Sequence, residues 1–269
     1  MAIQPDQPQS IGGVLDISFR LYKASIGSVW PLALLMILAS SPQTVFTLMQ
    51  GDTGVDPADP LSALAMFKDV RYWLVTLLGV VLTLWVVAAI YAKEHAIGVG
   101  EELSNGEALQ RALGSTIPLV IMTILFALAV AVGMVLLVVP GMILMVSLIL
   151  GTNLVVIEGN GPLAALTGSH RLVWGNWWRT TAILTVGFVI VIVIYFAVLM
   201  LVGIVLPLIG FGSSDPFMFA MITTFLVGAV INLLVTPYYV ALLISIYWDL
   251  KLRKEGGDLA ARVGALGTA

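Results

Sequence analysis

Long apolar runs alternate with short polar segments along the whole chain. The runs lie at residues 29–49, 72–92, 116–139, 142–157, 180–209 and 218–247. An α-helix rises about 1.5 Å per residue, so about 20 apolar residues cross a hydrocarbon core about 30 Å thick. The pattern therefore predicts an all-α polytopic membrane protein with six transmembrane helices. We expect residues 1–269 to form a single integral membrane domain with no soluble catalytic domain.

The connections between the runs predict three helical hairpins. Only Pro140 and Gly141 separate the third run from the fourth. Proline lacks the N–H that continues a helix, and glycine permits the positive φ of a tight turn. We therefore predict a compact turn at Pro140 and Gly141, with a helix ending on one side and another beginning on the other. A loop at residues 51–71 and a brief turn at residues 211–217 would close the other two hairpins.

A polar segment precedes each pair of runs. In the first, apolar and charged residues alternate at helical spacing. In the second, Ser104 stands three residues before Glu107, a spacing typical of a capping box. In the third, Pro162 suits the first turn of a helix that would end at Trp174. We predict a cytoplasmic amphipathic helix on the membrane surface in each segment. The segments lie at residues 11–28, 93–115 and 158–179.

The third of these surface helices has a recognisable apolar side. Leu163, Leu166 and Val173 would face lipid or the underlying spans. The polar residues from Ser169 to Arg171 would spread around the wetter side. Gly175 and Asn176 would then end the helix and turn the chain into the fifth span.

Composition agrees with a membrane protein and removes several kinds of chemistry. Hydrophobic residues make up 60% of the chain and charged residues 10%, against roughly 25% charged in ordinary globular proteins. There is no cysteine, which excludes disulfides and thiol catalysis, and there are two histidines. We therefore expect no metal site and no cofactor. The first ten residues are polar and carry no basic residue, so no cleavable signal peptide is expected.

The distribution of basic residues predicts the orientation. With a cytoplasmic N-terminus, the outer loops hold two basic residues, Lys68 and Arg71. The cytoplasmic segments then hold the other ten. Cytoplasmic loops carry the excess of Lys and Arg in membrane proteins. This asymmetry predicts a multi-pass protein with both termini in the cytoplasm.

The expected span interiors contain little reactive chemistry. Asn153 and Asn232 are the strongest polar groups inside the runs, and interhelical hydrogen bonding is the favoured role for both. No ionisable residue lies inside an expected span, which weighs against a proton-coupled pump. Adjacent Ser169 and His170 point to different faces of a helix and lack a third triad residue. We therefore expect no enzyme activity.

Aromatic and basic residues gather at the entrance to the fifth run. Indole rings settle at headgroup depth, and basic side chains can reach lipid phosphate from there. The cluster is either a general interfacial anchor or a binding site for an anionic phospholipid headgroup. Two basic residues of the first surface helix are candidates for the same role. The candidate headgroup ligands are Arg171, Trp174, Trp177, Trp178, Arg179, Arg20 and Lys23.

Several motifs resemble a known bacterial family. They are Pro140-Gly141, the stretch from Glu158 to Leu163, the stretch from Ser169 to Arg179, and the charged tail that begins at Tyr247. Together they are similar to a family of poorly characterised integral membrane proteins. That family includes the membrane-spanning region attached to some glycerophosphodiester phosphodiesterases. The resemblance implies a multi-span protein of the cytoplasmic membrane, and it implies no activity because the soluble phosphodiesterase domain is lacking.

Three classes of function remain open after these exclusions. The favoured one is a non-enzymatic protein that interacts with anionic phospholipids or organises the envelope through its interfacial helices. A transporter or permease for a small or lipid-like substrate is the alternative, and a membrane enzyme comes third. Membrane phospholipids are the expected partners, a homo-oligomer is possible, and no nucleic acid is expected. The sequence identifies no protein partner.

Overall fold

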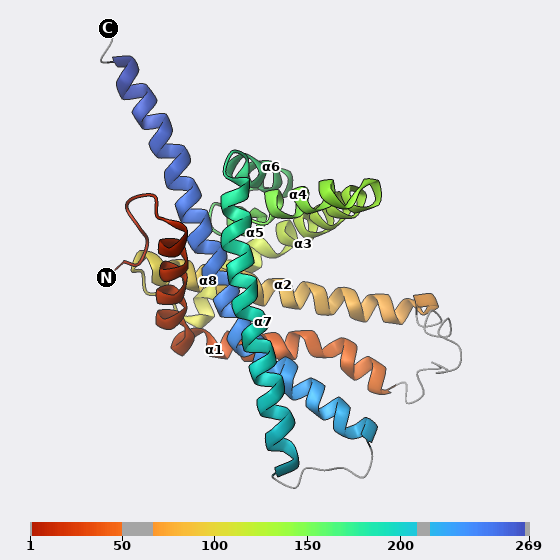
Figure 1. Ribbon diagram of the computed structural model, residues 1–269. Coiled ribbons are helices and arrows are strands. Elements are labelled where there is room, and N and C mark those ends of the chain that lie inside the picture. Colours follow the sequence, from red (N-terminus) through yellow and green to blue (C-terminus); the bar gives the residue numbers. More distant parts are fainter. Residues whose placement is uncertain (1, 50–66, 209–215, 267–269) are drawn as a thin grey trace.

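The computed structural model describes residues 2–49, 67–208 and 216–266 (Figure 1). Within these ranges every regular element is a helix, and six candidate spans are long and apolar enough to cross a membrane. This confirms an all-helical, multi-pass membrane protein. The expected loop at residues 51–71 and the expected turn at residues 211–217 lie mostly outside the described residues. The helices are α1 (Ile11–Met49), α2 (Val70–Val99), α3 (Asn105–Leu136), α4 (Val138–Leu148), α5 (Gly151–Val156), α6 (Pro162–Val173), α7 (Trp177–Leu208) and α8 (Pro216–Leu266).

Two of the three expected surface helices are not separate elements. The segment at residues 11–28 continues into the first apolar run as α1. Ser104 and Glu107 form the predicted capping box, but the helix that they start continues to Leu136 as α3. The polar residues between the parts interrupt the hydrophobic pattern without interrupting helix formation, because no glycine with positive φ stands between them. The prolines near the two junctions, Pro31 and Pro118, do not end their helices. Only the third segment gives a helix of its own, α6.

Helix α1 bends between its two parts, as Figure 1 shows. Pro31 lies inside the helix and cannot donate to the carbonyl of Gly27, four residues earlier. The apolar side of the first part contacts protein rather than lipid, since Val14 and Leu21 are completely buried. Helices α2 and α8 pack against α1 and account for this burial.

The prediction of a turn at Pro140 and Gly141 was wrong. The chain is helical through both residues, and the break lies at Leu137, whose φ of −165° and ψ of 147° are extended. Pro140 therefore stands in the first turn of α4, where its missing N–H is not needed. Gly141 serves close packing: a Cβ built on Gly133 would lie 2.8 Å from the Cα of Gly141. Helices α3 and α4 thus approach each other at these two glycines.

The expected fourth run is divided into two helices. α4 ends at Leu148 and α5 begins at Gly151. Ser169 of α6 bridges the break, because its Oγ accepts from the N–H of Leu150 at 3.1 Å and donates to the carbonyl of Ser147 at 2.8 Å. Ser169 is therefore completely buried, which corrects its expected place on the wetter side of the helix.

The packed core lies at one end of the spans. It is formed where α1, α2 and α8 meet, with α5 and α6 beside them, and it includes Leu21, Ile90 and Trp248. The other end is open: α7 leaves Phe188 and Phe196 more than half exposed. In Figure 1, α7 runs at a steep angle to α2 away from this core. Large apolar side chains on diverging helices are what a lipid environment would cover.

Candidate functional site

The link between α6 and α7 forms as the sequence predicts. Helix α6 begins at Pro162 and ends at Val173, and Trp174 is its extended C-cap. Gly175 follows with a φ of 92°, a conformation that favours glycine. The N–H of Asn176 donates to the carbonyl of Val173 at 2.8 Å, and α7 then begins at Trp177. This short link brings three tryptophans and Arg179 together.

A pocket of 660 Å³ lies beside this link. Its lining joins the link to the first two turns of α4, and Trp177 Nε1 fixes that contact by donating to the carbonyl of Ile143 at 3.3 Å. Trp174 and Trp178 are 57% and 80% exposed, so the pocket has apolar but accessible walls. The lining residues are Val139, Ile143, Trp174, Gly175, Asn176, Trp177, Trp178 and Arg179.

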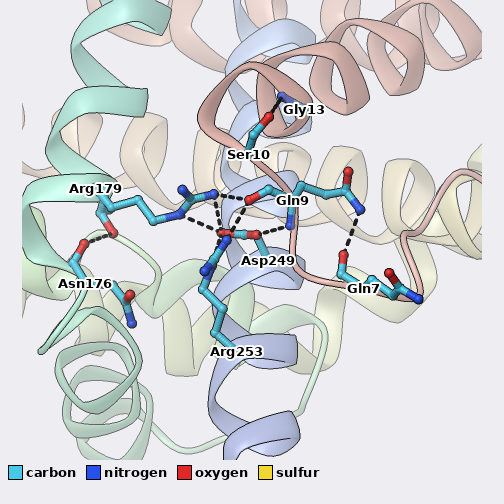
Figure 2. Close-up of polar contacts among 9 residues, drawn as sticks. Gln7, Gln9, Ser10, Gly13, Asn176, Arg179, Asp249 and Arg253 are labelled. Atoms are coloured by element: carbon cyan, nitrogen blue, oxygen red, sulfur yellow. Dashed lines mark hydrogen bonds and ion pairs between the residues drawn. The ribbon is translucent and has the colours of Figure 1, made fainter.

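Arg179 belongs to a buried ionic cluster next to the pocket, which Figure 2 shows. Its Nε donates to Oδ2 of Asp249 at 3.0 Å, and Arg253 Nε donates to the same oxygen at 3.0 Å. The Asp249 side chain is 1% exposed. Its Oδ1 accepts from the backbone N–H of Gln9 at 2.8 Å. We call Gln9, Arg179, Asp249 and Arg253 the Asp249 cluster; it joins the N-terminal segment to α7 and α8.

The cluster changes the role expected for Arg179. Part of its guanidinium holds Asp249, and its Nη2 donates to the carbonyl of Gln9 at 2.5 Å. Sequence reasoning missed Asp249 as a partner, because the residue was placed in a charged tail beyond the sixth span. The spacing of Asp249 and Arg253 is the signal that was present, since residues four apart are neighbours on a helix.

Basic groups remain in excess around the pocket. The Asp249 cluster contains two guanidinium groups and one carboxylate. Lys254 Nζ donates to the carbonyl of Trp174 at 3.0 Å, at the rim of the pocket, and its side chain is exposed. Arg171 is exposed on α6, two residues before the buried Val173. The other two basic candidates, Arg20 and Lys23, are exposed on α1 and do not line the pocket.

A second polar cluster fixes the loop before α6. Oε1 of Glu158 accepts from the Tyr247 hydroxyl at 2.6 Å and from Lys251 Nζ at 2.8 Å. Partial burial opposes ionisation of Glu158, but the hydrogen bonds from Lys251 and Tyr247 outweigh it and hold the pKa of this carboxyl below its ordinary value. The loop between α5 and α6 is thereby tied to α8.

One carboxyl is completely buried just beyond the expected end of the second run. The second run was expected to end at Ala92, but α2 continues to Val99 and buries Glu94 completely. Its Oε1 accepts from the Ser25 hydroxyl at 3.1 Å. Its Oε2 has no hydrogen-bond partner in the part of the chain that the structure describes. The expected absence of ionisable groups therefore covers the run at residues 72–92 and not the whole of α2.

The two interior asparagines differ in role. Asn153 Nδ2 donates across helices to the carbonyl of Leu243 at 2.9 Å, as expected. Asn232 Nδ2 donates instead to Gly228, one turn earlier in its own helix, at 2.9 Å. The amide group of Asn232 therefore donates within its own helix and not between helices as predicted.

A family model described as "Domain of unknown function (DUF7847)" matches residues 68–250, which is more than half of the chain. The match agrees with the expected uncharacterised family, and nothing in it links the chain to glycerophosphodiester phosphodiesterases. No curated protein and no solved structure matches the chain.

Proposed function

The chain belongs to this DUF7847 family of unknown function, and we propose that it is a non-enzymatic membrane protein that holds an anionic phospholipid at the pocket between α4, α6 and α7. The observation that carries the proposal is the combination of apolar walls and excess basic charge at one place. Trp174 and Trp178 offer surface to acyl chains or to the glycerol region. Arg171 and Lys254 offer positive charge within the same region.

A phospholipid has an apolar part and a charged headgroup, and each part fits a different feature of the pocket. Indole rings favour the boundary between hydrocarbon and water, where they contact both environments. A basic residue near an anionic leaflet contributes about 1 kcal/mol, so a small cluster gives a preference for anionic over zwitterionic lipid. An amphipathic ligand satisfies both parts of the pocket at once. The backbone carbonyl of Trp174 accepts a hydrogen bond from Lys254, which keeps this basic group next to the indole ring of Trp174.

The proposal includes a membrane and an orientation. We place the protein in a bacterial cytoplasmic membrane with both termini in the cytoplasm, and we place α6 at the cytoplasmic surface. Arg71 lies in the first turn of α2 and Lys68 just before this helix; Arg71 is roughly 40 Å along the helix from its last residue, Val99. The basic residues of the pocket region lie at the other, packed end of the spans. This separation supports the orientation that the basic residue counts predict.

Native mass spectrometry of the detergent-extracted protein tests the proposal. The variant Arg171→Gln/Lys254→Gln is expected to retain about thirtyfold less phosphatidylglycerol, since two basic contacts of about 1 kcal/mol each are lost. Arg111→Gln is the matched control, because Arg111 is also an exposed arginine but lies on α3, which contributes no residue to the pocket. Equal retention by the double variant and the control would contradict the proposal. The same spectra report whether the protein is a homo-oligomer.

A transporter or permease is the second candidate, favoured by the break between α4 and α5. Discontinuous helices often form substrate sites in transporters. Ser147 Oγ and Asn153 Oδ1 flank the break, are buried, and have no hydrogen-bond partner among the described residues. Vesicles with a fluorescent phosphatidylglycerol in both leaflets separate the two candidates. Faster loss of inner-leaflet fluorescence to dithionite with the protein than without it would favour transport.

A further inference from the structure

The N-terminal segment from Ala2 to Ser10 forms a strap across the packed end of the protein. The N–H groups of Ile3 and Gln4 donate to the carbonyl of Gly98, at the end of α2, at 2.7 and 3.0 Å. The strap then reaches α8, where the N–H of Gln9 donates to Asp249. Figure 1 shows this segment looping beside α8 before α1 begins. All of these contacts use the strap's backbone.

Two arginines converge on one carbonyl of the strap. Nη2 of Arg179 and Nη2 of Arg253 donate to the oxygen of Gln9 at 2.5 and 2.6 Å, as Figure 2 shows. Asp249 orients both groups through their Nε atoms. With two guanidinium groups and one carboxylate, the cluster carries one excess positive charge. A backbone carbonyl is neutral and leaves this charge uncompensated.

We infer that Arg179 and Arg253 form the phosphate-binding subsite of the pocket, and that the Gln9 carbonyl holds this position until a phosphate group displaces it. The inference rests on the proposed function and adds the group that the headgroup contacts. Arginine binds phosphate oxygens through paired, charge-assisted N–H donors, which are stronger than bonds to a neutral carbonyl. Arg179 also lines the pocket, so the subsite is continuous with it.

The charge of the cluster favours an anion at the position of the Gln9 carbonyl. One excess positive charge attracts a phosphate group, such as the phosphodiester of a diacyl phospholipid. Displacement removes the two arginine bonds to Gln9 O, so this end of the strap keeps the bond from the Gln9 N–H to Asp249, while Ile3 and Gln4 keep their bonds to Gly98.

Amide hydrogen exchange of the strap tests the inference on the full-length protein. In nanodiscs of phosphatidylglycerol, the amide of Gln9 should exchange roughly tenfold faster than in nanodiscs of phosphatidylcholine, because loss of the arginine bonds to its carbonyl weakens the hold on this end of the strap. The amides of Ile3 and Gln4, which keep their bonds to Gly98, are the internal reference. Adding inorganic phosphate to the phosphatidylcholine sample distinguishes a lipid phosphate from a free one. Acceleration by either source supports the subsite. Equal exchange in all three samples would overturn it.

Two variants connect this effect to the cluster. Arg253→Gln should abolish the difference in amide exchange between the two lipids, because one of the two guanidinium groups of the subsite is lost. Gln9→Ala should keep the difference, because the contacts at this position are made by its backbone. A lipid dependence that survives in Arg253→Gln would contradict the subsite. The proposed function fails separately: it falls if Arg171→Gln/Lys254→Gln retains lipid normally, whatever the strap does.

Discussion

Nε of Arg179 lies 3.0 Å from Oδ2 of Asp249, across 70 residues of sequence. The two residues connect the beginning of α7 to α8 at the packed end of the protein. The Arg179 side chain is 19% exposed and that of Asp249 is 1% exposed, so water screens the pair weakly. Removing one partner of a buried pair leaves the other charge without compensation. Removal of either Arg179 or Asp249 is therefore expected to destabilise the fold.

Asp249→Asn is expected to destabilise the protein by about 3 kcal/mol, because two guanidinium groups lose their carboxylate. In a chain of this size that corresponds to a fall of roughly 10 °C in the melting temperature measured in detergent. Asp69→Asn is the matched control, because its partner Arg71 is 75% exposed. The control should leave the melting temperature nearly unchanged, because water screens an exposed ion pair. Similar effects of the two substitutions would refute the structural role of the Asp249 cluster.

Gly98→Ala is expected to destabilise the protein by about 2 kcal/mol through overpacking. A Cβ on Gly98 would lie 2.2 Å from Cη2 of the buried Trp248. The double variant with Trp248→Phe should recover part of the loss, since the smaller ring leaves room. Gly12→Ala meets nothing within 4 Å and provides the control in thermal unfolding. Lack of any rescue by Trp248→Phe would show that the clash is not the cause.

Much of the fold could be predicted from the sequence, because lipid requires long apolar helices. The six runs correspond to the six candidate spans, and the proline at position 162 starts α6 as predicted. The errors concern where helices break. Pro140 was predicted to lie in a turn, but the first turn of a helix tolerates proline. The residue with an extended backbone is Leu137. Nothing in the side chain of Leu137 indicates this conformation.

The candidate site was only partly predictable. The tryptophans and Arg179 are close in sequence, so their clustering follows from the short link between α6 and α7. Gln9 and Asp249 come from the two ends of the chain, and their contact is made by a backbone group of Gln9. A backbone contact between distant segments leaves no residue pattern. The burial of Glu94 was missed for a different reason: the charged residues after Ala92 were assumed to end the helix.

Ser169→Ala is expected to destabilise the protein by about 2 kcal/mol, because the buried N–H of Leu150 and the carbonyl of Ser147 both lose a partner. The hydroxyl bridges the break between α4 and α5, so the effect should appear as faster amide exchange around Leu150. Thr167→Ala on the same helix is the control, because its exposed hydroxyl donates to carbonyls of its own helix. Unchanged exchange at the break in Ser169→Ala would contradict the bridging role.

Glu158 predicts a pH dependence of stability. Its folded-state pKa is lowered, so its contribution is present above the unfolded value of about 4.3 and is lost as pH falls through the folded value. The side chains of Glu158 and Lys251 are 28% and 36% exposed, which limits the contribution to about 1 kcal/mol. Glu158→Gln should therefore lower the melting temperature at pH 7 and have a vanishing effect near pH 3. A difference that is constant over this range would assign the loss to packing instead of charge.

Accessibility of introduced thiols tests the proposed orientation without background, because the chain contains no cysteine. Lys68→Cys and Gly12→Cys place single thiols at two exposed positions on opposite sides of the expected membrane. Intact cells treated with a membrane-impermeant maleimide should label Lys68→Cys, because the end of α2 with few basic residues is expected outside. Gly12→Cys should react only after the cells are permeabilised. Labelling of both variants in intact cells would contradict a cytoplasmic N-terminus, and with it the placement of the pocket at the cytoplasmic surface.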